Sequence, residues 1–135
     1  MLKKKLRNGA VVQLSLTCVS GGVLLILEEQ PADSSKARMH QSFILNPGEV
    51  SEFIDGLRKQ YCHIRATDGR KLEFRSPQAW EHQPIYISIK PESADEPVII
   101  FPLREHEIRF IRKALESLAA TLLFVGTWSG EPEEW

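Results

Sequence analysis

The sequence predicts an α+β protein in which a unit of four antiparallel strands and one helix occurs twice. Asn8-Gly9 and Asp68-Gly69 stand about 60 residues apart, each between two alternating runs. These dipeptides are typical of two-residue β-hairpin turns, in which both residues have positive φ. Each predicted hairpin is followed by two more apolar runs and then by an amphipathic helix. The recurrence of turn, strands and helix in one order favours a true internal repeat over chance.

The repeat divides the chain into units 1–61 and 62–124, followed by an acidic tail at 125–135. A unit of about 60 residues buries little apolar surface by itself. We therefore expect the two units to share one core in a single domain, 1–135, and to be related by a pseudo-twofold axis.

The first unit contains four predicted strands. Residues 2–7 and 10–19 flank the first turn, and alternation in the second of these runs predicts a strand with one buried face. Gly21-Gly22 forms the next turn. Val23–Leu27 is continuously apolar and predicts a central strand, and 39–45 supplies the fourth strand.

The helix of the first unit has a clear start signal. Asn46 can cap the helix, Pro47 has the φ of a first helical residue, and Glu49 completes a capping box. An apolar stripe from Val50 to Leu57 then predicts a helix that packs on a sheet.

The second unit repeats this order, with strands predicted at 62–67, 70–76, 85–90 and 98–101. Phe74 falls on the buried side of its strand. The second helix is expected over 103–124, with a stop at Gly126. Its pattern aligns Phe110-Ile111 with Phe53-Ile54 of the first helix.

Composition indicates an ordinary globular protein with 42% hydrophobic and 26% charged residues. The net charge of −1 conceals an asymmetry: residues 1–90 hold 13 Lys and Arg against 9 Asp and Glu, and residues 91–135 hold 4 against 9. Overall charge therefore does not predict nucleic-acid binding, although a local basic face is possible.

Two cysteines, Cys18 and Cys62, are too few for a disulfide framework and have no metal-ligand spacing. The basic N-terminus is followed by an alternating segment rather than by the apolar core of a secretion signal. No apolar run reaches the ~18 residues of a membrane helix. These features predict a cytoplasmic protein that does not contact membranes.

Alternation also predicts which cations point away from the helices. These outward cations are Lys3, Lys5 and Arg7 in the first unit and Arg65, Lys71, Arg75 and Lys90 in the second, where His63 also points outward. Tyr86 shares the outer side and could stack on a base. Cations along a surface and exposed aromatic faces are what single-stranded nucleic acids require. Because Lys3 and Lys5 correspond to His63 and Arg65, the two units are expected to present equivalent basic strips.

A second interpretation of the same residues stays open. Lys, Arg and Ser are expected on the solvated face of any one-sided sheet. Tyr86 would then be a cross-strand packing residue or an anchor between two chains.

The predicted order of elements resembles the single-stranded-DNA-binding transcriptional regulators, which include the positive cofactor four coactivator and the plant Whirly proteins. The segment Ser42–Val50, with Leu45-Asn46-Pro47 at its centre, is similar to the coactivator's step from strand to helix. The overall pattern also resembles small uncharacterised cyanobacterial proteins assigned to this fold. The resemblance implies a paired-sheet fold, nucleic-acid binding, and a basic loop before the fourth strand, where Lys36 and Arg38 stand.

We therefore expect a non-enzymatic, sequence-tolerant protein that binds single-stranded DNA or RNA and acts in transcription. The alternative is a protein-interaction module that keeps the fold without the ligand, and exposed sheet edges make a homo-oligomer plausible. The expected nucleic-acid-binding residues are Lys3, Lys5, Lys36, Arg38, Arg65, Lys71, Arg75, Tyr86 and Lys90.

Catalysis has little support in the sequence. The four histidines have no metal-ligand spacing, and no glycine-rich phosphate loop is present. No cofactor, metal or catalytic residue is expected.

Overall fold

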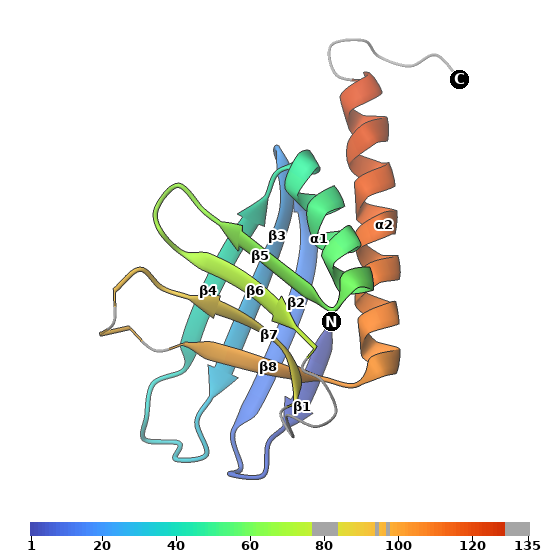
Figure 1. Ribbon diagram of the computed structural model, residues 1–135. Coiled ribbons are helices and arrows are strands. Elements are labelled where there is room, and N and C mark those ends of the chain that lie inside the picture. The colour runs from blue at the N-terminus through green and yellow to red at the C-terminus, as the bar shows by residue number, and fades with distance from the viewer. Residues whose placement is uncertain (77–83, 94, 97, 129–135) are drawn as a thin grey trace.

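The computed structural model describes residues 1–76, 84–93, 95–96 and 98–128, with the side chains of α2 described as far as residue 121. The first unit contains β1 (Leu2–Lys5), β2 (Val11–Val19), β3 (Gly22–Gln30), β4 (Met39–Leu45) and α1 (Pro47–Lys59). The second contains β5 (Tyr61–Arg65), β6 (Lys71–Arg75), β7 (Ile85–Lys90), β8 (Ile99–Leu103) and α2 (Glu105–Trp128). Each unit forms a four-stranded antiparallel sheet in chain order, sheet A from β1–β4 and sheet B from β5–β8 (Figure 1). The predicted α+β fold with two repeats is confirmed.

The first hairpin turn has a different geometry from the one the sequence predicts. Gly9 has a φ of 88°, but Asn8 does not have positive φ. The Gly9 amide donates to the Leu6 carbonyl at 3.0 Å, and the Leu6 amide donates to the Ala10 carbonyl at 2.7 Å. This is the three-residue hairpin in which a type I turn precedes one left-handed glycine. The Asn8 side chain accepts from the Ala10 amide at 2.9 Å and so stabilises the turn.

The second hairpin turn repeats this geometry. Gly69 has a φ of 90°, and its amide donates to the Ala66 carbonyl at 3.1 Å. The Ala66 amide donates to the Arg70 carbonyl at 2.8 Å, and Asp68 accepts from the Arg70 amide at 3.1 Å. Asn8-Gly9 and Asp68-Gly69 therefore mark equivalent positions of the two units, as predicted, although only the glycine of each pair is left-handed.

The helix starts show how the two units align. Asn46 accepts from the Glu49 amide at 2.8 Å, and Glu49 accepts from the Asn46 amide at 3.0 Å, which confirms the predicted capping box. At the start of α2 the Arg104 amide donates to Glu107 at 2.9 Å, so Glu107 occupies the position of Glu49. The predicted alignment with Phe110-Ile111 is consequently one residue out. Ile111 is the buried counterpart of Phe53, and Phe110 is 53% exposed.

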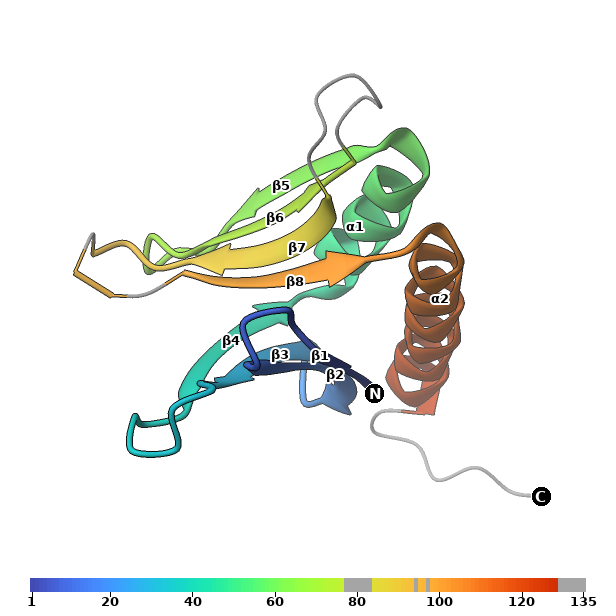
Figure 2. The same cartoon turned by 90° about the horizontal axis from the view of Figure 1, so that it is seen from below.

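One hydrophobic core draws on both units. The two sheets lie face to face with the core between them, and both helices pack at one end (Figure 2). Its largest fully buried side chains include four phenylalanines, each worth about 2–3 kcal/mol of buried apolar surface: Phe43, Phe53, Phe74 and Phe101. The prediction that Phe74 is a core residue is confirmed.

Lys4 lies on the inner side of β1, unlike Lys3 and Lys5. Its ammonium group pairs with Glu107 of α2 and lies 5.6 Å from the centre of the Phe101 ring. The contact joins the first strand of unit one to the last strand and helix of unit two.

The second helix is displaced from its prediction at both ends. It begins at Glu105 rather than Leu103 and continues through Gly126 to Trp128. Trp80 and residues 129–135 of the predicted acidic tail lie outside the described residues. Of the helices described, none is sufficiently long and apolar to span a membrane.

Candidate nucleic-acid interface

Three cations form a row across the outer face of sheet B. Strand pairing places Arg65 opposite Lys71, and Lys71 opposite Lys90. Directly opposed side chains in an antiparallel sheet lie only about 4.5–5.5 Å apart at Cβ, and like charges there are destabilising. This cation row (Arg65, Lys71, Lys90) is therefore a place where a bound anion would relieve repulsion.

A polar row (His63, Glu73, Ser88) crosses the same face, displaced by two residues along each strand from the cation row. His63 lies opposite Glu73, and Glu73 lies opposite Ser88. Glu73 is 9% exposed and Ser88 is fully buried. The Tyr86 hydroxyl donates to Glu73 at 2.9 Å, and the Lys90 ammonium lies 3.7 Å from the same carboxylate oxygen. Burial, and then the hydrogen bond to Glu73, raises the pKa of Tyr86, so its phenol remains a donor at neutral pH.

Burial and the neighbouring cation row both favour the neutral form of His63. Burial first, and then the charges of Lys71 and Arg65, lowers the pKa of His63, although Glu73 acts in the opposite direction. Within the described part of the chain, His63 Nε2 and Ser88 Oγ are buried and have no hydrogen-bond partner. The polar row therefore has unused hydrogen-bonding capacity on both sides of Glu73.

A third row on this face brings an aromatic ring beside a guanidinium group. Arg75 lies opposite Tyr86 in the register of β6 and β7, and Tyr61 lies opposite Arg75 on the edge strand. Tyr61 is 53% exposed. Sheet B thus brings together the five residues predicted in this unit: Arg65, Lys71, Arg75, Tyr86 and Lys90.

Sheet A carries the other four predicted residues. Lys3 and Lys5 are exposed on the outer side of β1. Arg38 contacts Glu28 at 3.3 Å and Gln30 at 3.4 Å, so part of its charge is already compensated. Lys36 is exposed in the connection between β3 and β4, beside a hollow of about 490 Å³.

The two groups lie on opposite surfaces of the molecule. Because the inner faces of the sheets turn toward each other, the outer faces point away from each other (Figure 2). Lys3 and Lys5 occupy the edge strand of sheet A as His63 and Arg65 occupy that of sheet B, as the repeat predicts. The equivalent strips therefore form two separate surfaces rather than one continuous groove.

Glu73 is the functional candidate that sequence reasoning missed. The sequence places it on the outer side of its strand, between Lys71 and Arg75, but gives it no role. A carboxylate that alternates with two cations was the available signal. Its burial and its contact with Tyr86 depend on the pairing of β6 with β7, which the sequence does not display.

The polar row contains the residue types of a hydrolytic triad in an order that does not suit one. A triad requires the imidazole between the nucleophile and the carboxylate. Here Glu73 stands in the middle, and His63 and Ser88 lie two strands apart, about 9–10 Å. Among the residues that the structure describes, no group of three His, Cys, Asp or Glu side chains could hold a metal ion.

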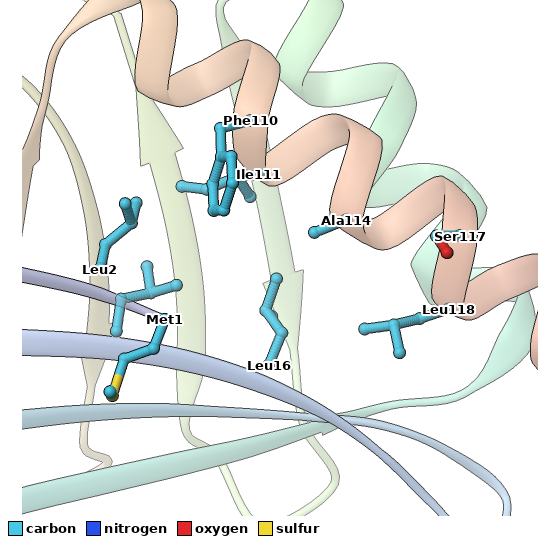
Figure 3. Close-up of a pocket in the computed structure, with 9 residues that line it drawn as sticks. Met1, Leu2, Leu16, Phe110, Ile111, Ala114, Ser117 and Leu118 are labelled. Atoms are coloured by element: carbon cyan, nitrogen blue, oxygen red, sulfur yellow. The ribbon is translucent and has the colours of Figure 1, made fainter.

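An apolar groove separates the start of sheet A from α2. Its volume is about 260 Å³. Leu2 and Leu16 approach it from the sheet, and Phe110 and Leu118 approach it from the helix (Figure 3). Phe110 leaves more than half of its surface exposed at this groove.

The comparisons with known proteins show a shared fold but assign no family. No protein-family model matches the chain, and no curated protein matches it in sequence. Among solved structures, the plant transcriptional regulator PBF-2 is similar over 99% of this chain and 98% of its own, with a TM-score of 0.57 and 13% identity. At that identity the likeness shows the fold alone, which confirms the fold that the resemblance to Whirly-type regulators implies. The resemblance to cyanobacterial proteins stays a prediction.

Proposed function

We propose that this protein binds single-stranded nucleic acid, DNA or RNA, through the outer faces of its sheets and acts as a non-enzymatic transcription cofactor in the cytoplasm. The fold that it shares with a transcriptional regulator supports this proposal. The observation that carries it is the cation row on sheet B.

The cation row favours a phosphate ligand for an energetic reason. Arg65, Lys71 and Lys90 oppose one another on neighbouring strands. Within strands β5, β6 and β7 the outer face holds one carboxylate, Glu73, and Lys90 is 3.7 Å from it. An arrangement that repels itself in the free protein gains when phosphates replace the missing counter-charge. Tyr86, in the third row of the same face, supplies the ring on which a base would stack.

Lysine reactivity provides a direct test of this face. A lysine-specific acetylating reagent is applied with and without a single strand of about 30 nucleotides, and each site is quantified by mass spectrometry. The proposal predicts protection of Lys71 and Lys90. Lys113, exposed on α2, is the control and should react equally in both samples. If Lys71 and Lys90 react to the same extent with and without the strand, as Lys113 does, sheet B is excluded as the binding surface.

A protein-interaction role is the second candidate, and the apolar groove favours it. The Phe110 ring lines this apolar groove and is 53% exposed, so the groove leaves apolar surface that a twofold contact between two copies would bury. We therefore assign a second copy of this chain to the groove. Light scattering after gel filtration tests it: Phe110→Ala should shift the protein toward monomer, and Lys113→Ala should not. A monomeric wild type would remove this candidate.

A further inference from the structure

We propose that the outer face of sheet B selects guanine in a bound single strand and that Glu73 makes the selection. The inference rests on the proposed function and adds a base preference to it. It starts from the polar row, which phosphate binding alone does not explain.

Glu73 is an unexpected residue at the centre of a surface that binds phosphates. Its negative charge repels a phosphate, and with 9% exposure it is costly to leave without partners. A surface that only followed the backbone would gain affinity from any neutral residue at this position. The carboxylate is therefore better explained by a contact with the bases.

Binding of a strand would remove Lys90, one of the partners that Glu73 has among the described residues. The Lys90 ammonium is 3.7 Å away, beyond hydrogen-bond length, and its side chain is 45% exposed. A phosphate competes readily for such a lysine. The Tyr86 hydroxyl, at 2.9 Å, is the firmer partner and keeps the ring beside the carboxylate. Glu73 then requires new N–H donors in place of Lys90.

The hydrogen-bonding pattern of guanine fits this requirement best. A carboxylate only accepts hydrogen bonds, and guanine offers two adjacent donors, N1–H and the 2-amino group. Adenine and cytosine offer one amino group beside an acceptor nitrogen. Thymine and uracil offer one N–H between two carbonyl oxygens, which repel a carboxylate. A base stacked over the phenol end of Tyr86 has its edge beside Glu73, because the hydroxyl and the carboxylate are already in contact.

The neighbours of Glu73 in the polar row have buried polar atoms, which a base does not reach in this structure. Ser88 Oγ and the neutral His63 Nε2 flank it in the polar row, and neither has a partner among the described residues. Both can adapt as donor or acceptor. Glu73, which keeps 9% of its surface exposed, is therefore the member of the polar row that offers an acceptor to the edge of a base.

The test compares four labelled strands of about 20 nucleotides by fluorescence anisotropy. One is all thymine, and the others carry isolated guanines, inosines or adenines at every fourth position, so that no guanine quadruplex forms. A bidentate contact predicts that the guanine strand binds at least about fivefold tighter than the thymine strand. Inosine lacks the 2-amino group and should lose most of that gain. Glu73→Gln should bind the thymine strand more tightly and should reduce the guanine preference to about twofold or less.

Glu28→Gln is the matched control, since it also removes one negative charge from an outer sheet face. It should leave the ratio of guanine to thymine affinity unchanged. Equal binding of guanine and thymine strands by the wild type would overturn the inference while leaving the proposed function intact, as would a preference that Glu73→Gln retains. Failure to bind any strand would instead refute the proposed function itself.

Discussion

Lys4 on the first strand pairs with Glu107 at the start of the last helix, a contact between residues 103 positions apart. One carboxylate oxygen of Glu107 makes two contacts, because it also accepts a hydrogen bond from the Arg104 amide at the start of α2. The side chains of Lys4 and Glu107 are 20% and 12% exposed. The pair therefore links helix capping in the second unit to the position of the first strand.

Removal of one partner should destabilise the fold more than removal of both. Lys4→Met leaves Glu107 mostly buried without its cation, and we expect a loss of about 1–3 kcal/mol in the free energy of unfolding. Lys4→Met with Glu107→Gln should recover part of that loss, since Gln keeps the capping geometry without the charge. Urea denaturation measures both. Lys5→Met, on the exposed side of the same strand, should stay within about 0.5 kcal/mol. Equal losses for the two single lysine variants would contradict this assignment.

The Lys4–Glu107 pair also predicts a pH dependence of stability. Burial tends to raise the pKa of Glu107, but the hydrogen bonds from Lys4 and from the Arg104 amide outweigh it and lower that pKa below its usual 4.5. A lowered pKa in the folded state gives stability that is present above the unfolded value and is lost as the pH falls through the folded value. Urea melts between about pH 3 and pH 7 should show this loss below pH 4.5 in the wild type. Glu107→Gln should have a shallower acid limb, and an identical acid limb would refute the assignment.

Charge reversal on sheet B should separate binding from stability. Lys71→Glu with Arg75→Glu should weaken single-strand binding at least about tenfold, because phosphate contacts contribute most of such affinity. Lys71→Glu by itself should leave the melting temperature nearly unchanged, since it replaces the middle charge of the repelling cation row. Anisotropy and thermal melts measure the two effects. Lys113→Glu on α2 is the control, and unchanged affinity in the folded double variant would remove this face from consideration.

Among the glycines from Gly9 to Gly69, which the structure describes, Gly22 is predicted to be the least tolerant of alanine. A Cβ atom there would lie 2.0 Å from the Leu45 carbonyl oxygen, so the backbones of β3 and β4 would have to separate. We expect Gly22→Ala to cost about 3 kcal/mol or more. Gly48→Ala is the comparison, because its Cβ would meet only the Asn46 side chain at 3.4 Å and alanine favours a helix. Urea denaturation that ranks Gly48→Ala as the worse variant would contradict the tight approach of the two strands.

Local patterns allowed the architecture to be predicted from the sequence. The capping box at Asn46 and Glu49 is a contact between near neighbours, so its residues reveal it directly. The hairpin positions were also correct, but the turn type was not, since Asn-Gly fits a two-residue turn and a three-residue turn equally well. The predicted alignment of the two helices was one residue out at Phe110 because it was based on their apolar residues alone. Glu107, the better marker, has no Asn-Pro before it.

The features that depend on pairing between distant segments could not be predicted. Lys4 and Glu107 meet only because the two units stack, and nothing near either residue indicates the other. The outward positions of Lys71, Tyr86 and Lys90 followed from alternation, but their registration into rows required the pairing of β6 with β7. The same is true of Glu73, whose burial turns an ordinary surface carboxylate into a candidate for base recognition.

Binding of a labelled single strand of about 30 nucleotides, compared with the duplex of the same sequence across a salt series, tests the central claim most directly. We predict micromolar or tighter affinity for the single strand, weaker binding of the duplex, and a slope of log affinity against log salt of about −2 or steeper. This slope is expected because three cations of the cation row would each displace counterions at about 0.7 per contact. Absence of binding at low salt, or affinity that does not change with salt, would contradict the account and leave only the shared fold.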